Sequence, residues 1–353
     1  MELRATKGLR QFSFSLFAFP LLAFSQPLHS LVSHVPVLLN EVLAALEPKA
    51  GETYADCTAG LGGHACAVAK RMGHGTIVLN DVDPANLERA AGAVREVWKS
   101  TAQGLEGLGT HGLEAHATVV VRGNFAELPH VLRERGICAN MILADLGFAS
   151  NQIEDASRGF SFQRDGPLDM RLDPTLPMHA GHLVNSAPEA ELVRILTEYG
   201  EESGARRIAR KLVDVRSMKP IATTSELAGA VHAALGFSGG PIDPATRTFQ
   251  AIRIAVNDEL GSLEGLLGLV EQACGELAAG RATWLAKGAR VAIISFHSLE
   301  DRLVKQAFGR IGKQYAKQGA KEVTKHPVTA SEAELGWNPR ARSAKLRCVR
   351  VCG

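Results

Sequence analysis

Short apolar runs alternate with segments of helical periodicity between residues 53 and 146, and this alternation limits the fold more than any other feature. Strands are predicted at residues 53–56, 76–80, 118–122 and 141–146. Strands that alternate with helices are typical of a parallel sheet covered by helices on both faces. The sequence therefore predicts an α/β fold with a mostly parallel, doubly wound sheet.

The helices in this region are predicted from apolar spacings of three to four residues and from Pro or Gly near their ends. They cover residues 37–46, 64–72, 84–97 and 128–135. Residues 100–117 are rich in Gly, His and Thr and show no clear period, so we expect a surface loop there.

The strand rhythm stops after Asp145 and returns at residues 290–296. The intervening chain contains loops rich in Pro and Gly, and helical patterns at residues 189–199, 205–215 and 225–235. This order favours a helical subdomain inserted into one α/β domain over two domains in series. We predict that residues 34–150 and 250–353 form the α/β domain, and that residues 151–249 form the inserted, substrate-recognising subdomain.

Residues 1–33 differ from the rest of the chain. Basic residues precede an apolar run at 12–24, which Pro20 interrupts. This is the outline of a signal peptide, although the run is short for a membrane span. An organellar transit peptide, a disordered extension and translation from too early a start fit the same pattern. We expect folding to begin near His34.

Composition limits the kinds of partner. Hydrophobic residues make up 46% and charged residues 22% of the chain, which excludes wholesale disorder. The net charge of +2 provides no global attraction to nucleic acid or membrane, so any such binding must come from local patches. The six cysteines contain no CxxC pair, so we predict no metal site and no disulfide framework, and a reducing compartment fits best.

A glycine-rich turn, DCTAGLGGH (56–64), joins the first strand to its helix. Glycines permit positive φ and let a ligand approach the backbone, and the N–H groups at the helix start face it. Asp81 follows the second strand at the same edge of the sheet, where an acid can bind two ribose hydroxyls. The pair predicts a cofactor that contains adenosine.

The spacing leaves the identity of this cofactor open. Gly60, Gly62 and Ala65 satisfy the dinucleotide pattern G-x-G-x-x-G/A. Asp56, four residues before Gly60, favours S-adenosylmethionine, because a carboxylate can hold its cationic amino-acid end and would repel a pyrophosphate. The simpler alternative is that these glycines and acids only form turns.

Asp145 ends the fourth strand at the same edge and is the predicted catalytic residue. If the reaction is methyl transfer from S-adenosylmethionine to an exocyclic amine of a base, the lone pair of that amine is delocalised into the ring. A proton acceptor must then orient the N–H group and take its proton. A turn or N-cap aspartate is the alternative. Phe125, just past the third strand, can cover an adenine face, although a phenylalanine there more often belongs to the core.

Candidate substrate contacts come from the loop after the fourth strand, from the end of the 290–296 strand and from two basic clusters. In that loop charges alternate with aromatic residues, which suggests function, although surface ion pairs would explain it too. Ser298 and Asp301 are predicted to form a capping box. The two basic clusters are suited to binding phosphates. For the cluster at residues 206–210, the simpler explanation is a helix face that is exposed to solvent. The candidates are Phe148, Arg158, Asp169, Arg206, Arg207, Arg210, His297, Arg340 and Arg342, with Lys345, Arg347 and Arg350 in the same C-terminal basic cluster.

Eight blocks of the chain are recognisable as a set. They are HVPVLLNEV (34–42), DCTAGLGGHA (56–65), NDVDP (80–84), DLGFASNQIEDASRGFSFQRDGPLDMRLDP (145–174), YGEESGARRIAR (199–210), ATRTFQAIRIAVNDEL (245–260), VAIISFHSLEDRLVK (291–305) and NPRARSAKLR (338–347). In this order they resemble the RsmH/MraW family, S-adenosylmethionine-dependent methyltransferases that act on N4 of a cytidine in small-subunit ribosomal RNA.

The resemblance implies a Rossmann-like class I methyltransferase domain with an inserted helical subdomain. It implies S-adenosylmethionine contacts at Gly62, Gly63, His64, Asp81, Phe125, Asp145 and Gln152. Asp145 then has two expected roles, which are compatible if it bridges cofactor and base. The expected partner is ribosomal RNA in an assembled or nearly assembled small subunit, without a membrane, and a homodimer is one expected assembly. The expected location is cytoplasmic, or organellar if residues 1–33 are a transit peptide.

The chain departs from the family pattern near the predicted pocket. Cys57 stands where glycine is usual, Ala59 where a bulky aromatic is usual, and Asn80 where an aliphatic residue precedes the acid. Phe148 and Ala149 replace a small aliphatic residue and a serine. We expect activity with altered cofactor affinity. The alternatives are a non-catalytic ribosome-assembly or RNA-binding factor and an NAD-dependent oxidoreductase.

Overall fold

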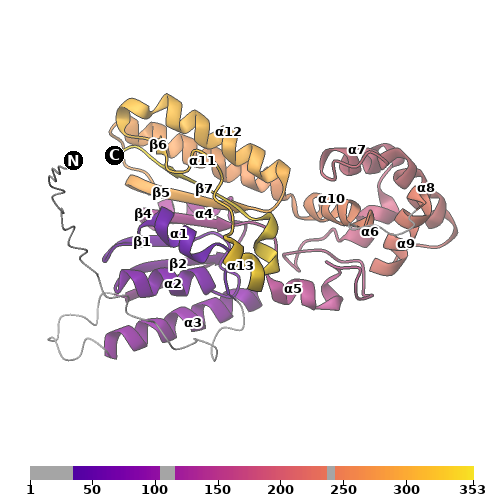
Figure 1. The fold of residues 1–353 in the computed structure, drawn as a ribbon, viewed down its shortest axis with the longest axis horizontal. Coiled ribbons are helices and arrows are strands. Elements are labelled where there is room, and N and C mark those ends of the chain that lie inside the picture. The colour runs from indigo at the N-terminus through magenta and orange to yellow at the C-terminus, as the bar shows by residue number, and fades with distance from the viewer. Residues whose placement is uncertain (1–34, 104–115, 237–242) are drawn as a thin grey trace, which may run out of the picture. The chain divides into compact units, whose positions relative to one another are not determined.

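The computed structural model describes residues 35–103, 116–236 and 243–353 of the chain (Figure 1). The predicted leader at residues 1–33 lies outside these ranges. So does most of the loop predicted at residues 100–117.

The strands of the described ranges form one seven-stranded sheet in the order β3-β2-β1-β4-β5-β7-β6. They are β1 (Thr53–Asp56), β2 (Gly75–Asp81), β3 (His116–Arg122), β4 (Ala139–Asp145), β5 (Leu285–Ser295), β6 (Lys321–Glu322) and β7 (Lys345–Arg350). The pairs from β3 to β5 are parallel, and β7 pairs antiparallel with both β5 and β6. The predicted α/β fold with a mostly parallel sheet is confirmed.

Helices connect the strands and also fill the long segment between β4 and β5. The α-helices of the described ranges are α1 (Leu39–Leu46), α2 (Gly63–Met72), α3 (Pro84–Gln103), α4 (Leu128–Glu134), α5 (Ser150–Glu154), α6 (Ala180–Ser186), α7 (Glu189–Glu198), α8 (Ala205–Met218), α9 (Thr224–Leu235), α10 (Ala245–Asn257), α11 (Glu259–Ala278), α12 (Ser298–Gln314) and α13 (Glu332–Trp337). None of them combines the length and the hydrophobicity that crossing a bilayer requires.

The predicted bounds of the 100–117 loop were wrong, because residues 100–103 belong to α3 and residues 116–117 belong to β3. The C-terminal basic cluster contains a strand that was not predicted, β7. Arg347 is buried there, and its Nε donates to Asp301 Oδ1 at 2.7 Å. Charged and apolar residues alternate in KLRCVR, and this period of two was the available strand signal.

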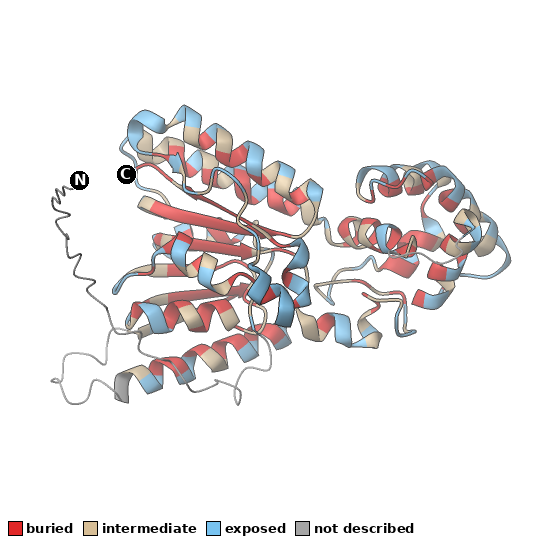
Figure 2. Cartoon of the chain, viewed as in Figure 1, coloured by how far each residue is buried: buried red, intermediate tan, exposed pale blue. Residues whose placement is uncertain are grey.

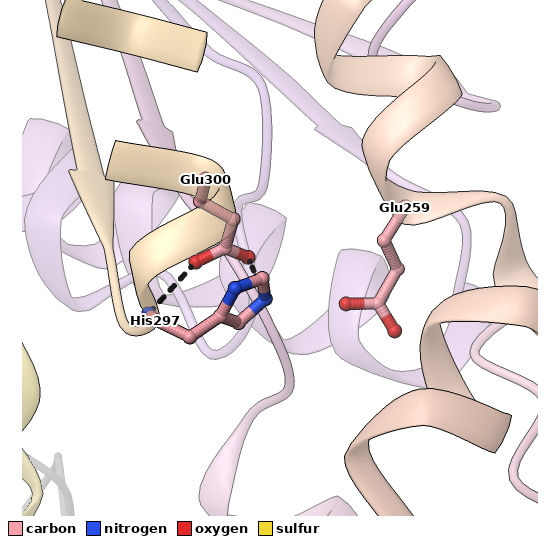
Figure 3. A group of neighbouring side chains, drawn as sticks. All are labelled: Glu259, His297 and Glu300. Carbon is pink, nitrogen blue, oxygen red and sulfur yellow. Dashed lines mark hydrogen bonds and ion pairs between the residues drawn. The ribbon is translucent and has the colours of Figure 1, made fainter. Parts of the chain in front are cut away.

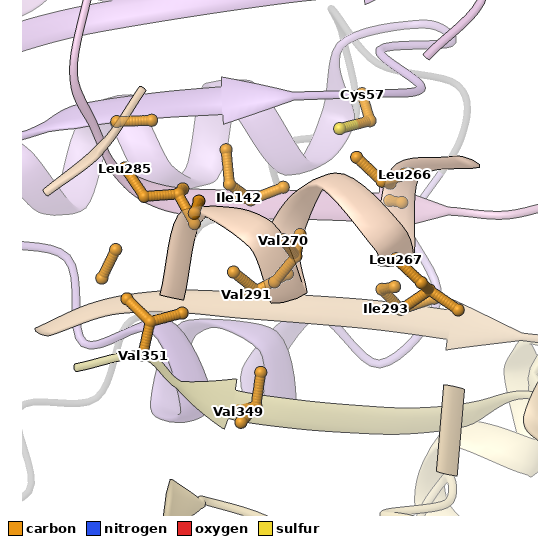
Figure 4. Close-up of a cluster of buried hydrophobic side chains, with 14 of the residues drawn as sticks. Cys57, Ile142, Leu266, Leu267, Val270, Leu285, Val291, Ile293, Val349 and Val351 are labelled. Atoms are coloured by element: carbon orange, nitrogen blue, oxygen red, sulfur yellow. The ribbon is translucent and has the colours of Figure 1, made fainter. Parts of the chain in front are cut away.

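Hydrophobic cores lie on both faces of the sheet. On one face, residues such as Ile142, Val291 and Val349 pack against α4, α11 and α12 (Figure 4). On the other face, Met141 and Leu143 pack with residues of α1, α2 and α3. Neighbours on β4 thus point to opposite faces, as the two-residue period of a strand requires. The central strands are buried along most of their length (Figure 2).

The helical segment between β4 and β5 has a hydrophobic core of its own. Side chains of α6–α10 pack there together with three residues of the loop after β4, Phe160, Leu168 and Met170. Within this segment, α8 packs against α6, α7 and α9. A role of this segment in recognising substrate stays a prediction.

Candidate functional site

Three carboxylates mark the carboxyl edge of the sheet. Asp56, Asp81 and Asp145 are the last residues of β1, β2 and β4, and β1 lies between the other two strands. Parallel strands end at the same edge, so the topology brings together three acids that are far apart in the sequence.

The glycine turn after β1 is held by close packing. Gly62 has φ +83°, and a Cβ atom there would lie 2.8 Å from the Cα atom of Ala90 on α3. A Cβ atom on Gly63 would lie 2.5 Å from Pro36 Cγ. Packing alone therefore requires glycine at both positions. Their predicted contact with a cofactor stays a prediction.

Asp81 anchors this turn. Its carboxylate accepts hydrogen bonds from the backbone N–H groups of Gly60 and Asp83, each at 2.8 Å. Burial raises the pKa of Asp81 to about 6, against the opposing effect of these hydrogen bonds. A carboxylate has about four acceptor sites, so Asp81 retains acceptor capacity for hydroxyl groups of a ligand.

Asp56 is buried behind the turn. It accepts hydrogen bonds from the Tyr54 hydroxyl at 2.9 Å and from the Thr58 N–H group at 3.2 Å. Burial raises the pKa of Asp56 to about 7, and the negative charge of Asp81 adds to this increase. The carboxylate therefore gains from any cation that comes near it.

Asp145 has the most perturbed carboxyl group of the three. Burial raises its pKa to about 8, with contributions from Asp56 and Glu300, whereas Arg340 acts in the opposite direction. Its Oδ1 atom is buried and has no hydrogen-bond partner among the described residues. Its side chain is nevertheless 26% exposed, so a ligand can reach it.

His64 at the start of α2 faces Asp145. The His64 Nε2 atom is 2.9 Å from the carbonyl oxygen of Val37, which requires the proton on Nε2. The Nδ1 atom then faces Asp145 Oδ2 at 3.7 Å. This distance is longer than that of a hydrogen bond.

Asp83 joins the β2–α3 loop to the segment after β4. Its Oδ2 atom accepts hydrogen bonds from Arg158 at 2.8 Å and from Gln152 at 3.0 Å. Burial raises the pKa of Asp83, but these two bonds, the charge of Arg158 and a hydrogen bond from the Ala85 N–H group together bring it below its usual value. Arg158 and Gln152, predicted to contact substrate and cofactor, therefore both have partners within the protein.

Phe148 contacts both an aromatic ring and a cation. Its ring stacks with Phe160 at a centroid distance of 5.6 Å, and the Arg253 guanidinium lies 4.9 Å from its ring centre. Arg253 also donates to both carboxylate oxygens of Glu259, each at 2.8 Å. Phe148 therefore has an oriented ring, as a base-stacking surface needs.

His297, Glu300 and Glu259 form a further polar group, in which ligating atoms lie within 4.8 Å of one another (Figure 3). Such a set can in principle hold a metal ion, whereas the sequence predicted no metal site. Both oxygens of Glu259 are already held by Arg253, however, and His297 Nε2 lies 3.2 Å from Glu300 Oε1. In this group Glu259 forms an ion pair with Arg253, and His297 lies close to Glu300.

The capping box predicted from Ser298 and Asp301 was wrong. Helix α12 begins with Ser298, and Glu300 accepts hydrogen bonds from the N–H groups of Phe296 and His297. The Ser298 hydroxyl donates instead to Glu201 at 2.6 Å. Asp301 pairs with Arg347, so each residue of the expected cap has another role.

The remaining predicted residues are dispersed. Phe125 packs against the core under α11, and Asp169 pairs with Arg171 at 2.7 Å. The α8 arginines lie on a helix that packs against α6, α7 and α9, and a shared phosphate-binding surface with the C-terminal arginines stays a prediction. Among these arginines, Arg206, Arg207 and Arg342 are exposed, Arg210 lies 3.7 Å from Glu189, and Arg340 is near enough to Asp145 to affect its pKa.

Several residues that form hydrogen bonds and ion pairs around the candidate site were not predicted from the sequence. Asp83, Arg253 and Glu259 lie within recognised blocks, but their partners are distant in the sequence or belong to another element. Asn80, which departs from the family pattern, donates hydrogen bonds to the carbonyl oxygens of Cys57 and Gly123, at 2.8 and 3.0 Å. It thereby links the chain after β1 to the chain after β3.

The arrangement favours a cationic ligand. Three acidic groups with raised pKa values line one edge, and a positive charge beside them would relieve both the cost of burial and their mutual repulsion. A pyrophosphate would increase that repulsion.

Comparison with known proteins identifies the family. The model of the MraW methylase family matches residues 31–352. "Ribosomal RNA small subunit methyltransferase H" of Acidobacterium capsulatum is 42% identical over 319 residues, which cover 90% of this chain and 97% of that protein. The proteins of the same name from Heliobacterium modesticaldum and Rickettsia massiliae are each 40% identical, and the matches cover 90% of this chain and 97% and 98% of those proteins. The chain therefore belongs to the MraW methylase family.

Proposed function

We propose that this methyltransferase transfers a methyl group from S-adenosylmethionine to the exocyclic N4 amine of a cytidine in small-subunit ribosomal RNA. The names of its relatives support the RNA, and the resemblance described above supports the N4 amine. The observation that carries the proposal is the group of three carboxylates, Asp56, Asp81 and Asp145, at one edge of the sheet.

The carboxylates fit S-adenosylmethionine better than a dinucleotide. This cofactor carries a sulfonium and an ammonium group, and it supplies a methyl group bound to the positively charged sulfur. Asp56 and Asp145 would stabilise the positive charges, and the free acceptor sites of Asp81 suit ribose hydroxyls. The buried Oδ1 atom of Asp145, which lacks a partner among the described residues, marks where a further donor is needed.

Asp145 would act on the amine. Its pKa of about 8 keeps the carboxyl group largely protonated at neutral pH in the absence of a cation. A bound cation lowers that pKa, so the carboxylate becomes ionised when the site is loaded. It can then accept a hydrogen bond from the N4 amine. Asp145 would thereby orient the amine, and it would receive the proton that the nitrogen loses on methylation.

Phe148 would position the cytosine. Its ring is held by Phe160 and Arg253, is only partly buried, and follows Asp145 by three residues. Enzymes that modify a base commonly take it out of its stack and hold it against apolar side chains. The helical segment between β4 and β5 supplies Phe160 and Arg253, and we propose that it recognises the RNA around that base.

The proposal is tested by incubating the purified full chain with methyl-labelled S-adenosylmethionine and unmodified small ribosomal subunits, followed by nucleoside analysis of the RNA. We expect label in N4-methylcytidine. Naked ribosomal RNA in parallel shows whether the assembled subunit is needed. Label in another nucleoside would overturn the proposed target, and cofactor binding without transfer would favour an assembly factor. Since the relatives are bacterial, we also propose a cytoplasmic location.

A further inference from the structure

The outer surface of α12 carries a groove that none of the roles above uses. The groove has a volume of about 590 Å³. It is lined by Arg302, Lys305, Gln306, Gly309, Arg310, Lys313, Glu322 and Lys325, that is, by five cations and a single carboxylate. The lining alone carries more net positive charge than the +2 of the whole chain.

Most of this charge is not neutralised by the protein. Arg302 and Arg310 form exposed ion pairs with Glu201 and Glu271, at 3.3 and 3.0 Å. Lys305, Lys313 and Lys325 are exposed and form no ion pair with another described residue. Exposed ion pairs contribute little and exchange readily, so all five cations are available to an anion.

The groove begins beside the candidate site and leads away from it. Helix α12 starts directly after His297, and Arg302, near its first turns, contacts Glu201 of the helical segment. From Arg302 to Lys313 the helix rises by roughly 16 Å at 1.5 Å per residue. This length faces several consecutive phosphates of a nucleic acid strand.

Resting on the proposed function, we propose that this groove binds the phosphate backbone of the RNA next to the modified nucleotide. Cations from α12 and from the segment after β6 converge on the groove from two sides, as an extended polyanion requires. A membrane surface fits less well, because the lining contains no large apolar side chain for insertion between lipids.

The test compares two triple variants of the full chain that lose the same charge. One is Lys305→Gln/Lys313→Gln/Lys325→Gln in the groove. The control is Lys49→Gln/Lys70→Gln/Lys287→Gln, whose exposed lysines lie near the amino ends of the parallel strands. Fluorescence anisotropy with a labelled single-stranded RNA of mixed sequence measures affinity between 50 and 200 mM salt, conditions over which phosphate contacts are strongly screened.

Each phosphate contact to a single strand contributes about 0.7 to the slope of log affinity against log salt. We expect the groove variant to lose about two units of this slope. The ratio of wild-type to variant affinity should therefore change roughly 20-fold between 50 and 200 mM salt. The control should follow the wild type. Calorimetry should show unchanged binding of S-adenosylmethionine in both variants, and circular dichroism should show unchanged folding.

Equal salt slopes for the groove variant and the control would overturn the inference. The inference would also be overturned if the wild type bound phosphatidylserine vesicles and the groove substitutions abolished that binding but left RNA binding intact. The proposed function fails separately: it fails if the wild type binds RNA through the groove but transfers no methyl group to it. If methyl transfer occurs and the groove variant behaves like the control, the groove inference alone is wrong.

Discussion

Asp145 combines a strongly raised pKa with one oxygen that lacks a partner among the described residues. Asp145→Asn keeps the shape of the side chain but cannot accept a proton. We expect methyl transfer to fall by at least about 100-fold, the lower range for losing a positioned acid or base. We expect the free energy of unfolding at pH 8.5 to rise by roughly 1–3 kcal/mol, because an ionised, poorly paired group is removed.

Asp214→Asn on the exposed surface of α8 is the matched control and should change neither quantity. Activity is measured by transfer of labelled methyl groups and stability by urea denaturation. Full activity in Asp145→Asn would contradict the assigned role of this carboxyl group.

The three carboxylates also predict how cofactor affinity depends on pH. Their pKa values of about 6, 7 and 8 mean that the unliganded site takes up protons below pH 8. Binding a cation releases these protons, so affinity should increase as pH rises from about 6 to 8, by at most about tenfold per unit for each proton released. Calorimetry in buffers of different ionisation enthalpy measures this release, and an affinity independent of pH would count against a cationic ligand.

The same groups act on stability with the opposite sign. Between about pH 4 and pH 8 the folded protein binds more protons than the unfolded chain, since an unperturbed aspartate has a pKa of about 3.9. The free energy of unfolding of the protein without cofactor should therefore fall as pH rises through this window. Denaturation at pH 5.5 and 8.5 checks the direction, and Asp145→Asn should show a smaller decrease.

At the level of elements, α2 approaches α3 closely at Gly62. Gly62→Ala would bring a Cβ atom to 2.8 Å from Ala90 Cα at a positive φ. Gly236→Ala is a control, because Gly236 also has a positive φ of +70° but no atom within 4 Å of its Cβ position. Overpacking should make Gly62→Ala less stable than the control by about 1–3 kcal/mol in urea denaturation. Equal losses would show that only backbone conformation matters.

The ion pair between α10 and α11 gives a second prediction at this scale. The side chains of Arg253 and Glu259 are 13% and 10% exposed. Arg253→Met leaves the carboxylate without its partner, and we expect a loss of about 3–5 kcal/mol. Glu259→Gln in the same chain should recover a large part of it. A double-mutant cycle by urea denaturation measures the coupling, and a double variant less stable than Arg253→Met would exclude this explanation.

For the whole molecule, β7 completes the sheet. It lies between β5 and β6, and it pairs with β5 over six residues. Removing residues 345–353 would expose the edge of β5 and the apolar residues of both faces. We expect aggregation and the loss of cooperative unfolding, seen by size-exclusion chromatography and circular dichroism. Removing residues 1–30, which precede the family match, is the control, and a monodisperse 1–344 chain would show that β7 is dispensable.

Much of the fold was predictable because strand and helix periods differ and alternate regularly up to β4. The position of β7 in the sheet was not predictable, because the residues of this strand do not indicate which strands it pairs with. At the site, the position of Asp81 beside the glycine turn was predictable, because both follow directly after strands of the same sheet. The hydrogen bonds of Asp83 were not predictable, because its partners Gln152 and Arg158 are about seventy residues away in the sequence. The pKa values depend on burial, which a sequence pattern does not specify.

The place of β7 also has a consequence for biosynthesis. β5 ends at Ser295 and β7 begins at Lys345, so about fifty residues are translated between them. At 5–20 residues per second this takes roughly 3–10 s, during which one edge of β5 has no partner. The sheet can therefore close only after residues 345–350 have also been translated.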